Sequence, residues 1–183
     1  QALAAIAQPA SQDPMQENHR LHDYLVGGYR GISYIDADGL EQNPTIRLVG
    51  HRPEDNELLA VQQVTVRTAE HERRFDVVLF VNGLPLVFFE LKQAGSKHAD
   101  LAAAHSQFQT YLREFPMAFR FAAFNVISDG ITARYGTPFT ALEHFAPWNV
   151  DDDGKPVKSG AALDDEHGGT ELEYLIEGLF NPE

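Results

Sequence analysis

An acidic and a basic residue stand two positions apart in a segment that is otherwise apolar. Glu90 and Lys92 are separated only by Leu91, and residues 84–89 carry no charge. In a β-strand, residues two apart point to the same face of the sheet, so the two charged side chains would share one surface. Placing charge in an apolar strand costs free energy unless the charge is paired or used. These two residues are therefore candidates for chemistry.

A second carboxylate could join them. Asp76 precedes the apolar residues 77–81, and if this strand pairs with the next one, its side chain can reach the end of the sheet where Glu90 lies. Two carboxylates about 4 Å apart repel by about 4 kcal/mol at an effective dielectric of 20. Mg²⁺, which commonly takes one or two carboxylates, would relieve this repulsion, and Lys92 could then orient or deprotonate a water that attacks phosphorus. The alternative is a structural ion pair of Glu90 with Lys92 or Arg74.

The relation between Asp76 and Glu90 depends on the register of the hairpin that joins them. A strict two-residue turn at the Asn-Gly pair 82–83 pairs Val81 with the residue after the turn, and leaves Glu90 on the face opposite to Asp76. A three-residue loop or a bulge pairs Val81 with Pro85 and sets Asp76 opposite Glu90. We predict the second register, because a metal site needs both carboxylates on one face.

The elements that must position these residues follow from hydrophobic periodicity. Apolar residues at helical spacing predict helices over residues 15–26, 100–115 and 172–179, and residues 1–7 favour helix. Strands are predicted over residues 29–35, 45–49, 58–66, 77–81, 84–91, 119–127 and 131–135. Two of these strands are apolar on both faces, so helices must cover both sides of the sheet. The fold class is therefore α/β, with a mixed central β-sheet flanked by helices.

The chain of 183 residues predicts one domain in three parts. Residues 1–28 form a helical lead-in, and residues 29–148 form a sheet-and-helix core. Residues 149–183 combine an acidic loop with a last helix, which begins at the capping box of Thr170 and Glu173. Because the sequence starts at Gln1 and stops shortly after this helix, we expect a fragment of a longer chain.

Composition excludes several classes of protein. The chain has 27 acidic and 14 basic residues, a formal charge of −13, so it is not a freestanding basic nucleic-acid binder. It has no cysteine, which excludes disulfides, a thiolate nucleophile and cysteine-based metal sites and fits a cytoplasmic protein. No apolar run approaches the roughly 18 residues of a bilayer span, so no membrane partner is expected. His19 and His22, at helical spacing, are interpreted as a surface pair and not as a zinc site.

A longer stretch places these residues in a known context. Residues 73–92, RRFDVVLFVNGLPLVFFELK, resemble the nuclease core of the restriction (R) subunit of type I restriction-modification enzymes, which belongs to the PD-(D/E)xK nuclease superfamily. Asp76 matches the first acid of that motif, with phenylalanine before it in place of proline, and Glu90 and Lys92 match its second half. Gln107 and Tyr111 resemble the Gln-xxx-Tyr motif that follows the core. Residues 124–137 and 175–182 are similar to the segments that come next, the second leading into an ATP-driven translocase.

The resemblance implies a restriction-endonuclease-like core with a defined site. Asp76, Glu90 and the backbone carbonyl of Leu91 would hold Mg²⁺, with Mn²⁺ as a substitute, and Lys92 would act at the attacking water. Gln107 and Tyr111 would support the site and contact the DNA backbone. The implied function is cleavage of unmodified double-stranded DNA after ATP-driven translocation.

The same resemblance implies several partners: the modification and specificity subunits of the restriction complex, and the motor domains of the same polypeptide. ATP would bind only in those motor domains, which this chain lacks. The alternatives are another nuclease of the same superfamily and a catalytically silent domain that docks the R subunit on its complex. Arg73 and Arg74 also keep two interpretations, as solvated charges or as donors to phosphate.

Overall fold

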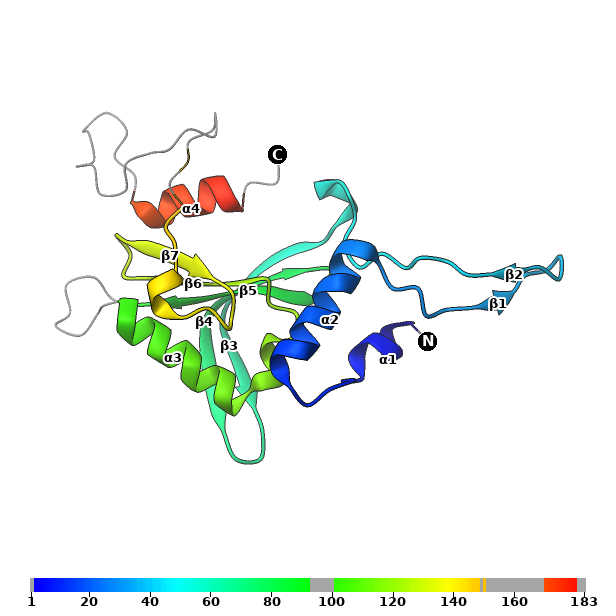
Figure 1. The fold of residues 1–183 in the computed structure, drawn as a ribbon. Coiled ribbons are helices and arrows are strands. Elements are labelled where there is room, and N and C mark those ends of the chain that lie inside the picture. The colour runs from blue at the N-terminus through cyan, green and yellow to red at the C-terminus, as the bar shows by residue number, and fades with distance from the viewer. Residues whose placement is uncertain (1, 93–100, 149, 151–169, 181–183) are drawn as a thin grey trace.

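A five-stranded mixed sheet forms the centre of the computed structural model, which describes residues 2–92, 101–148, 150 and 170–180 (Figure 1). Its strands are β3 (Leu58–Arg67), β4 (Glu72–Val81), β5 (Leu84–Leu91), β6 (Phe124–Ser128) and β7 (Ala133–Gly136), in the order β3-β4-β5-β6-β7. Strands β5 and β6 run parallel, and every other neighbouring pair is antiparallel. This confirms the predicted α/β class with a mixed central sheet.

Helices cover the two faces of this sheet, as the apolar central strands require (Figure 1). Helix α3 (Leu101–Glu114) packs Phe108 and Tyr111 against Phe75 and Phe88 of the sheet. On the other face, α4 (Glu171–Leu179) buries Leu175 beside Val87, Phe89 and Val126. Helix α4 begins with the predicted capping box, in which the Thr170 hydroxyl accepts from the Glu173 N–H.

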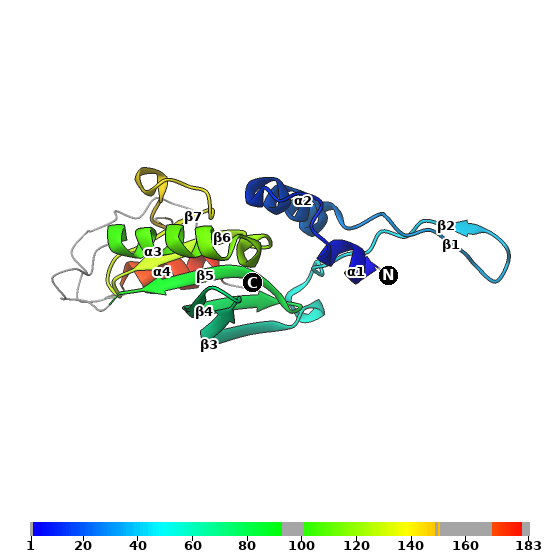
Figure 2. The same ribbon diagram turned by 90° about the horizontal axis from the view of Figure 1, so that it is seen from below.

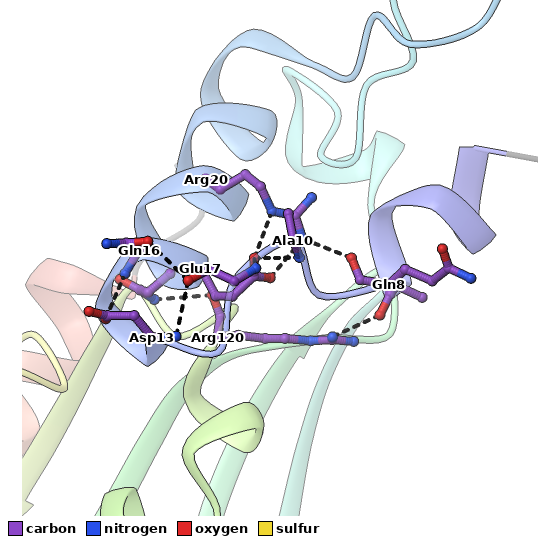
Figure 3. Close-up of polar contacts among 10 residues, drawn as sticks. Gln8, Ala10, Asp13, Gln16, Glu17, Arg20 and Arg120 are labelled. Carbon is purple, nitrogen blue, oxygen red and sulfur yellow. Dashed lines mark hydrogen bonds and ion pairs between the residues drawn. The ribbon is translucent and has the colours of Figure 1, made fainter.

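Two N-terminal helices, α1 (Ala2–Ala7) and α2 (Pro14–Gly27), lie where the sequence predicted helix over residues 1–7 and 15–26. Glu17 is fully buried between them, where one carboxylate oxygen accepts from the backbone N–H groups of Ala10 and Ser11, both at 2.8 Å. Arg20 forms an ion pair with the same carboxylate, and Arg120 donates to the carbonyl of Ala7 (Figure 3). These contacts fix the connection between the two helices and join it to the core.

Strands β1 (Tyr34–Ile35) and β2 (Glu41–Gln42) form a two-stranded arm that projects from the body (Figures 1 and 2). The predicted strand over residues 29–35 was therefore too long, and the one over residues 45–49 was wrong, because in this described part of the chain Tyr29 and Ile46 form only an isolated bridge. The arm lies outside the main sheet, so these segments lack a neighbouring strand that would extend the pairing.

Other boundaries differ from the predicted ones by a few residues. Strand β4 begins at Glu72 because it forms a long hairpin with β3, closed by residues 68–71, whereas the two predicted strands stopped at residue 66 and resumed only at residue 77. Strand β6 begins at Phe124, because a 3-10 turn occupies Pro116–Phe119. Further 3-10 turns lie at Pro53–Asp55 and Leu142–His144. Most of the predicted acidic loop, residues 151–169, lies outside the described residues.

Candidate active site

The register of the β4–β5 hairpin, which sets Asp76 beside Glu90, differs from the predicted one near the turn. Its turn is a strict two-residue turn, with Val81 opposite Leu84, and Asn82 and Gly83 both have positive φ, 51° and 78°. The expected pairing of Val81 with Pro85 is therefore wrong, because the Asn-Gly turn keeps its ideal length.

A bulge one pair further on restores the register that the site needs. Phe80 opposes Pro85 but Leu79 opposes Val87, so Leu86 is the extra residue on β5. The shifted register continues to Val77 opposite Phe89. The next position on each strand is Asp76 and Glu90. The bulge thus makes Asp76 and Glu90 the residues that directly follow the last pair of the two strands, which the strict turn alone would prevent.

A second irregularity lies at Asp76 itself. Phe75 and Val78 both join the apolar cluster beneath α3, although they are three apart, whereas Val77 joins the opposite cluster. On the neighbouring strand Gln63 has a positive φ of 58°, and its side-chain amide donates to Asp76 Oδ1 at 3.3 Å. Asp76 Oδ2 accepts from the backbone N–H of Leu91 at 2.8 Å. Two donors therefore hold this carboxylate beside the end of β5.

Glu90 is the last of four consecutive buried residues of β5 and is only 2% exposed. Its Oε1 accepts from Lys92 Nζ at 2.6 Å, while Oε2 has no hydrogen-bond partner among the described residues. Burial raises the pKa of the Glu90 carboxyl, the Lys92 hydrogen bond opposes this effect, and the negative charge of Asp76 adds to it. An oxygen that is buried, unpartnered and close to a second carboxylate is suited to a cation.

Lys92 connects the carboxylates to helix α3. Besides Glu90, its Nζ donates to Gln107 Oε1 at 2.7 Å, and the Gln107 amide donates to the hydroxyl of Tyr111 one turn later. Burial raises the pKa of Tyr111 as well. The structure thus brings together all the side chains that the sequence predicted: Asp76, Glu90, Lys92, Gln107 and Tyr111.

The site contains two carboxylates and no third acidic or imidazole ligand within the described chain. Those residues hold no group of three or more His, Cys, Asp or Glu side chains suited to a metal. Two carboxylates and a backbone carbonyl are nevertheless a normal protein share of a Mg²⁺ site, because this ion usually keeps several waters. The Asp76–Glu90 pair with the adjoining Leu91 carbonyl therefore fits the expected donor set.

The remaining sequence candidates can now be placed relative to this site. The ion pair of Glu90 with Lys92, which the sequence offered as a structural alternative, is present, whereas no ion pair of Arg74 occurs among the described residues. His19 lies on the surface in a 3.7 Å contact with Asp23, in line with the predicted surface position. Gln63 was missed by sequence reasoning, because its role depends on a backbone irregularity in β3 that has no residue signal.

The five-stranded mixed sheet and its flanking helices form an α/β core of the restriction-endonuclease-like kind. The sequence model of the family described as the N terminus of the type I restriction enzyme R protein matches residues 1–144. The chain belongs to this family.

Curated relatives agree with this membership. The endonuclease subunit of the type I restriction enzyme HindI from Haemophilus influenzae is 36% identical over 173 residues, which cover 93% of this chain and 16% of that protein. A putative endonuclease subunit, MjaIXP, from Methanocaldococcus jannaschii is 30% identical over 70% of this chain and 13% of its own length. The EcoprrI endonuclease subunit of Escherichia coli is 29% identical over 68% of this chain. The chain thus spans about one seventh of the first two relatives.

No helix among the described residues has the length and apolar character needed to cross a bilayer.

Proposed function

We propose that this chain is the metal-dependent DNA endonuclease domain of a type I restriction enzyme R subunit. The proposal is supported by the position of Asp76 and Glu90 directly after the last pair of β4 and β5, Val77 with Phe89, and by Glu90 Oε2, which is buried and unpartnered among the described residues. The relatives described above are named endonuclease subunits, which supports the same reaction class.

Asp76, Glu90 and the carbonyl of Leu91 would hold Mg²⁺, or Mn²⁺ in its place. When bound, the ion would supply positive charge that polarises the phosphodiester and neutralises charge developing on its oxygens. Hydrolysis forms one bond from a water oxygen to phosphorus and breaks one ester P–O bond. The protein must therefore orient that water and stabilise the charge.

Lys92 would do both. Its Nζ donates to Glu90 and Gln107, so the ammonium form keeps a third N–H for the attacking water or for a phosphoryl oxygen. Gln107 fixes the position of Nζ, and Tyr111 supports Gln107 through the helix. The water loses its proton to solvent or to a transiently neutral Lys92, and the ester oxygen leaves as the hydroxyl of the other product after taking a proton from solvent. In this scheme the chain supplies orientation and charge, while recognition of a DNA sequence is left to other parts of the enzyme.

The family implies a larger assembly around this domain. We infer that motor domains of the same polypeptide bind ATP and translocate double-stranded DNA, and that modification and specificity subunits select unmodified DNA. The domain would cut after translocation stalls, in the bacterial or archaeal cytoplasm.

The test uses the full R subunit assembled with its modification and specificity subunits. We expect Asp76→Ala, Glu90→Ala and Lys92→Ala each to abolish DNA cleavage while ATP hydrolysis persists. Asp23→Ala, which removes an exposed carboxylate on α2, is the matched control and should cleave normally. Intact cleavage by any of the three variants would remove that residue from the mechanism.

A second measurement is independent of activity. A crystal soaked in Mn²⁺ should show anomalous density between Asp76 and Glu90, with oxygen distances of about 2.1 to 2.3 Å. Normal folding without metal density and without loss of cleavage in the variants would instead favour a silent docking domain.

A further inference from the structure

A groove of about 400 Å³ runs along α3 beside the candidate active site. Its lining consists of Arg73 from β4 and of Ala103, Ser106, Gln107, Thr110 and Tyr111 from α3. Gln107 and Tyr111 belong to both places, because Gln107 also receives the hydrogen bond from Lys92. The groove therefore opens onto the side chains that hold the candidate catalytic lysine.

Arg73 is held at the wall of this groove. Its Nε contacts Glu114 Oε2 at 2.8 Å and its Nη2 donates to Glu114 Oε1 at 2.9 Å, while the side chain remains 42% exposed. A guanidinium has five N–H donors, so the pair with Glu114 fixes its plane and leaves other donors for a ligand. The neighbouring Arg74 does not line the groove.

The opposite wall offers an exposed hydroxyl and little bulk. Ser106 is exposed, and its hydroxyl has no hydrogen-bond partner in the described part of the chain. Thr110 donates its hydroxyl to the carbonyl of Ser106, and Ala103 has only a small side chain. None of the six lining residues is acidic, although the whole chain carries a charge of −13. A cationic donor, a neutral donor and an absence of carboxylates in the lining suit a phosphodiester.

We propose that this groove binds the backbone of the DNA strand that continues from the cleaved bond, with Arg73 and Ser106 contacting one of its phosphates. The identity of the strand as DNA rests on the proposed endonuclease function. The contact carries no sequence information, because phosphates are the same at every position. It holds the strand that carries the cleaved bond and keeps that bond against Lys92.

The first test measures how salt changes the binding of a fluorescent single-stranded oligonucleotide, by anisotropy, without divalent cations. Removing one phosphate interaction with a single strand reduces the slope of log affinity against log salt by about 0.7. Arg73→Ala should show this reduction. Arg52→Ala is the matched control, because Arg52 forms an equivalent two-point pair with Asp55 but does not line the groove. Equal slopes for the two variants would overturn the proposal.

The second test places charge in the groove without touching Arg73. Ser106→Asp should weaken binding of the oligonucleotide about fivefold through like-charge repulsion, while the neutral Ser106→Asn should change it much less. Melting curves check that each variant folds. If both variants bind alike, the groove does not hold the strand.

The two proposals can fail separately. Loss of cleavage in Asp76→Ala together with equal salt slopes for the two arginine variants would overturn the groove and leave the nuclease. A reduced slope for Arg73→Ala, with full cleavage by Asp76→Ala, would retain the groove as a strand-binding site and overturn the nuclease mechanism. If Arg73→Ala reduced the salt slope more for an RNA oligonucleotide than for a DNA oligonucleotide, the assignment of the bound strand as DNA would be overturned.

Discussion

The pKa of the Glu90 carboxyl is set by opposing effects, and it makes the stability of the chain depend on pH. Burial and the charge of Asp76 raise this pKa, and the hydrogen bond from Lys92 lowers it, with a net upward shift. A carboxyl whose pKa is raised by folding binds its proton more tightly in the native state. The free energy of unfolding therefore falls as pH rises from the ordinary glutamate pKa through the raised one.

Glu90→Gln should remove this decrease. At neutral pH without divalent cations, we expect its free energy of unfolding to exceed that of the parent chain by on the order of 1 kcal/mol. The amide oxygen of glutamine can still accept from Lys92 Nζ, so this hydrogen bond is retained while the negative charge of the carboxylate is removed. Urea denaturation between pH 4 and 8 measures the effect, and a parallel pH dependence in both proteins would contradict it.

Glu17→Gln provides a control of opposite sign. The hydrogen bond from Arg20 is the main effect that lowers the pKa of Glu17, so its contribution is present above the ordinary glutamate pKa and is lost as pH falls through the lowered one. This variant should be less stable than the parent chain at neutral pH, and the difference should shrink in acid.

At the scale of elements, the hairpin of β4 and β5 decides whether a site exists. The position of its turn could be predicted, because Asn-Gly between apolar runs favours a hairpin loop, but the two-residue length that this pair favours was set aside for a shifted register, which was wrong at the turn. Its bulge could not be located, because Leu86 is as apolar as its neighbours and both faces of β5 are covered. The periodicity therefore held no information on which face Glu90 occupies. Only the requirement that both acids share a face pointed to a shifted register.

Gly83→Ala tests how much the hairpin contributes. Gly83 has φ of 78° and open space where the methyl group of alanine would stand, so the cost is backbone strain of about 1 to 2 kcal/mol. Gly39→Ala is the matched control, with φ of 78° and equal space, but in the projecting arm. Urea denaturation should show a loss of global stability for Gly83→Ala and little change for Gly39→Ala, because the arm can open without the core. Equal losses would show that the arm unfolds with the sheet.

At the scale of the whole molecule, the fold agrees with the proposed nuclease, whereas the net charge opposes binding of its DNA substrate. The α/β class and the covered sheet could be predicted, because strands that are apolar on both faces require helices on each side. The extent of the arm could not, since short polar strands with few partners leave no periodic signal. The charge of −13 opposes DNA binding, whereas no acidic residue lines the groove on α3.

The isolated chain should therefore bind duplex DNA poorly. Affinity for DNA rises with the number of phosphates that Lys and Arg neutralise, and this chain has 14 such residues against 27 acids. We expect no nanomolar binding at physiological salt by anisotropy, and a shallow salt dependence. Nanomolar affinity under those conditions would contradict the division of labour between this domain and the rest of the R subunit.

The bulge at Leu86 also implies a parity rule for related chains. Adding a residue to one strand between the turn and the site shifts every later partner by one position and turns the glutamate to the far side of the sheet. Lengthening both strands together changes the count by two and preserves the pairing. The interval between the aspartate and the glutamate can therefore vary among relatives in even steps, whereas an odd step must be accompanied by the gain or loss of a bulge. An alignment that tolerates single-residue gaps between these two acids would thus match chains whose carboxylates cannot meet.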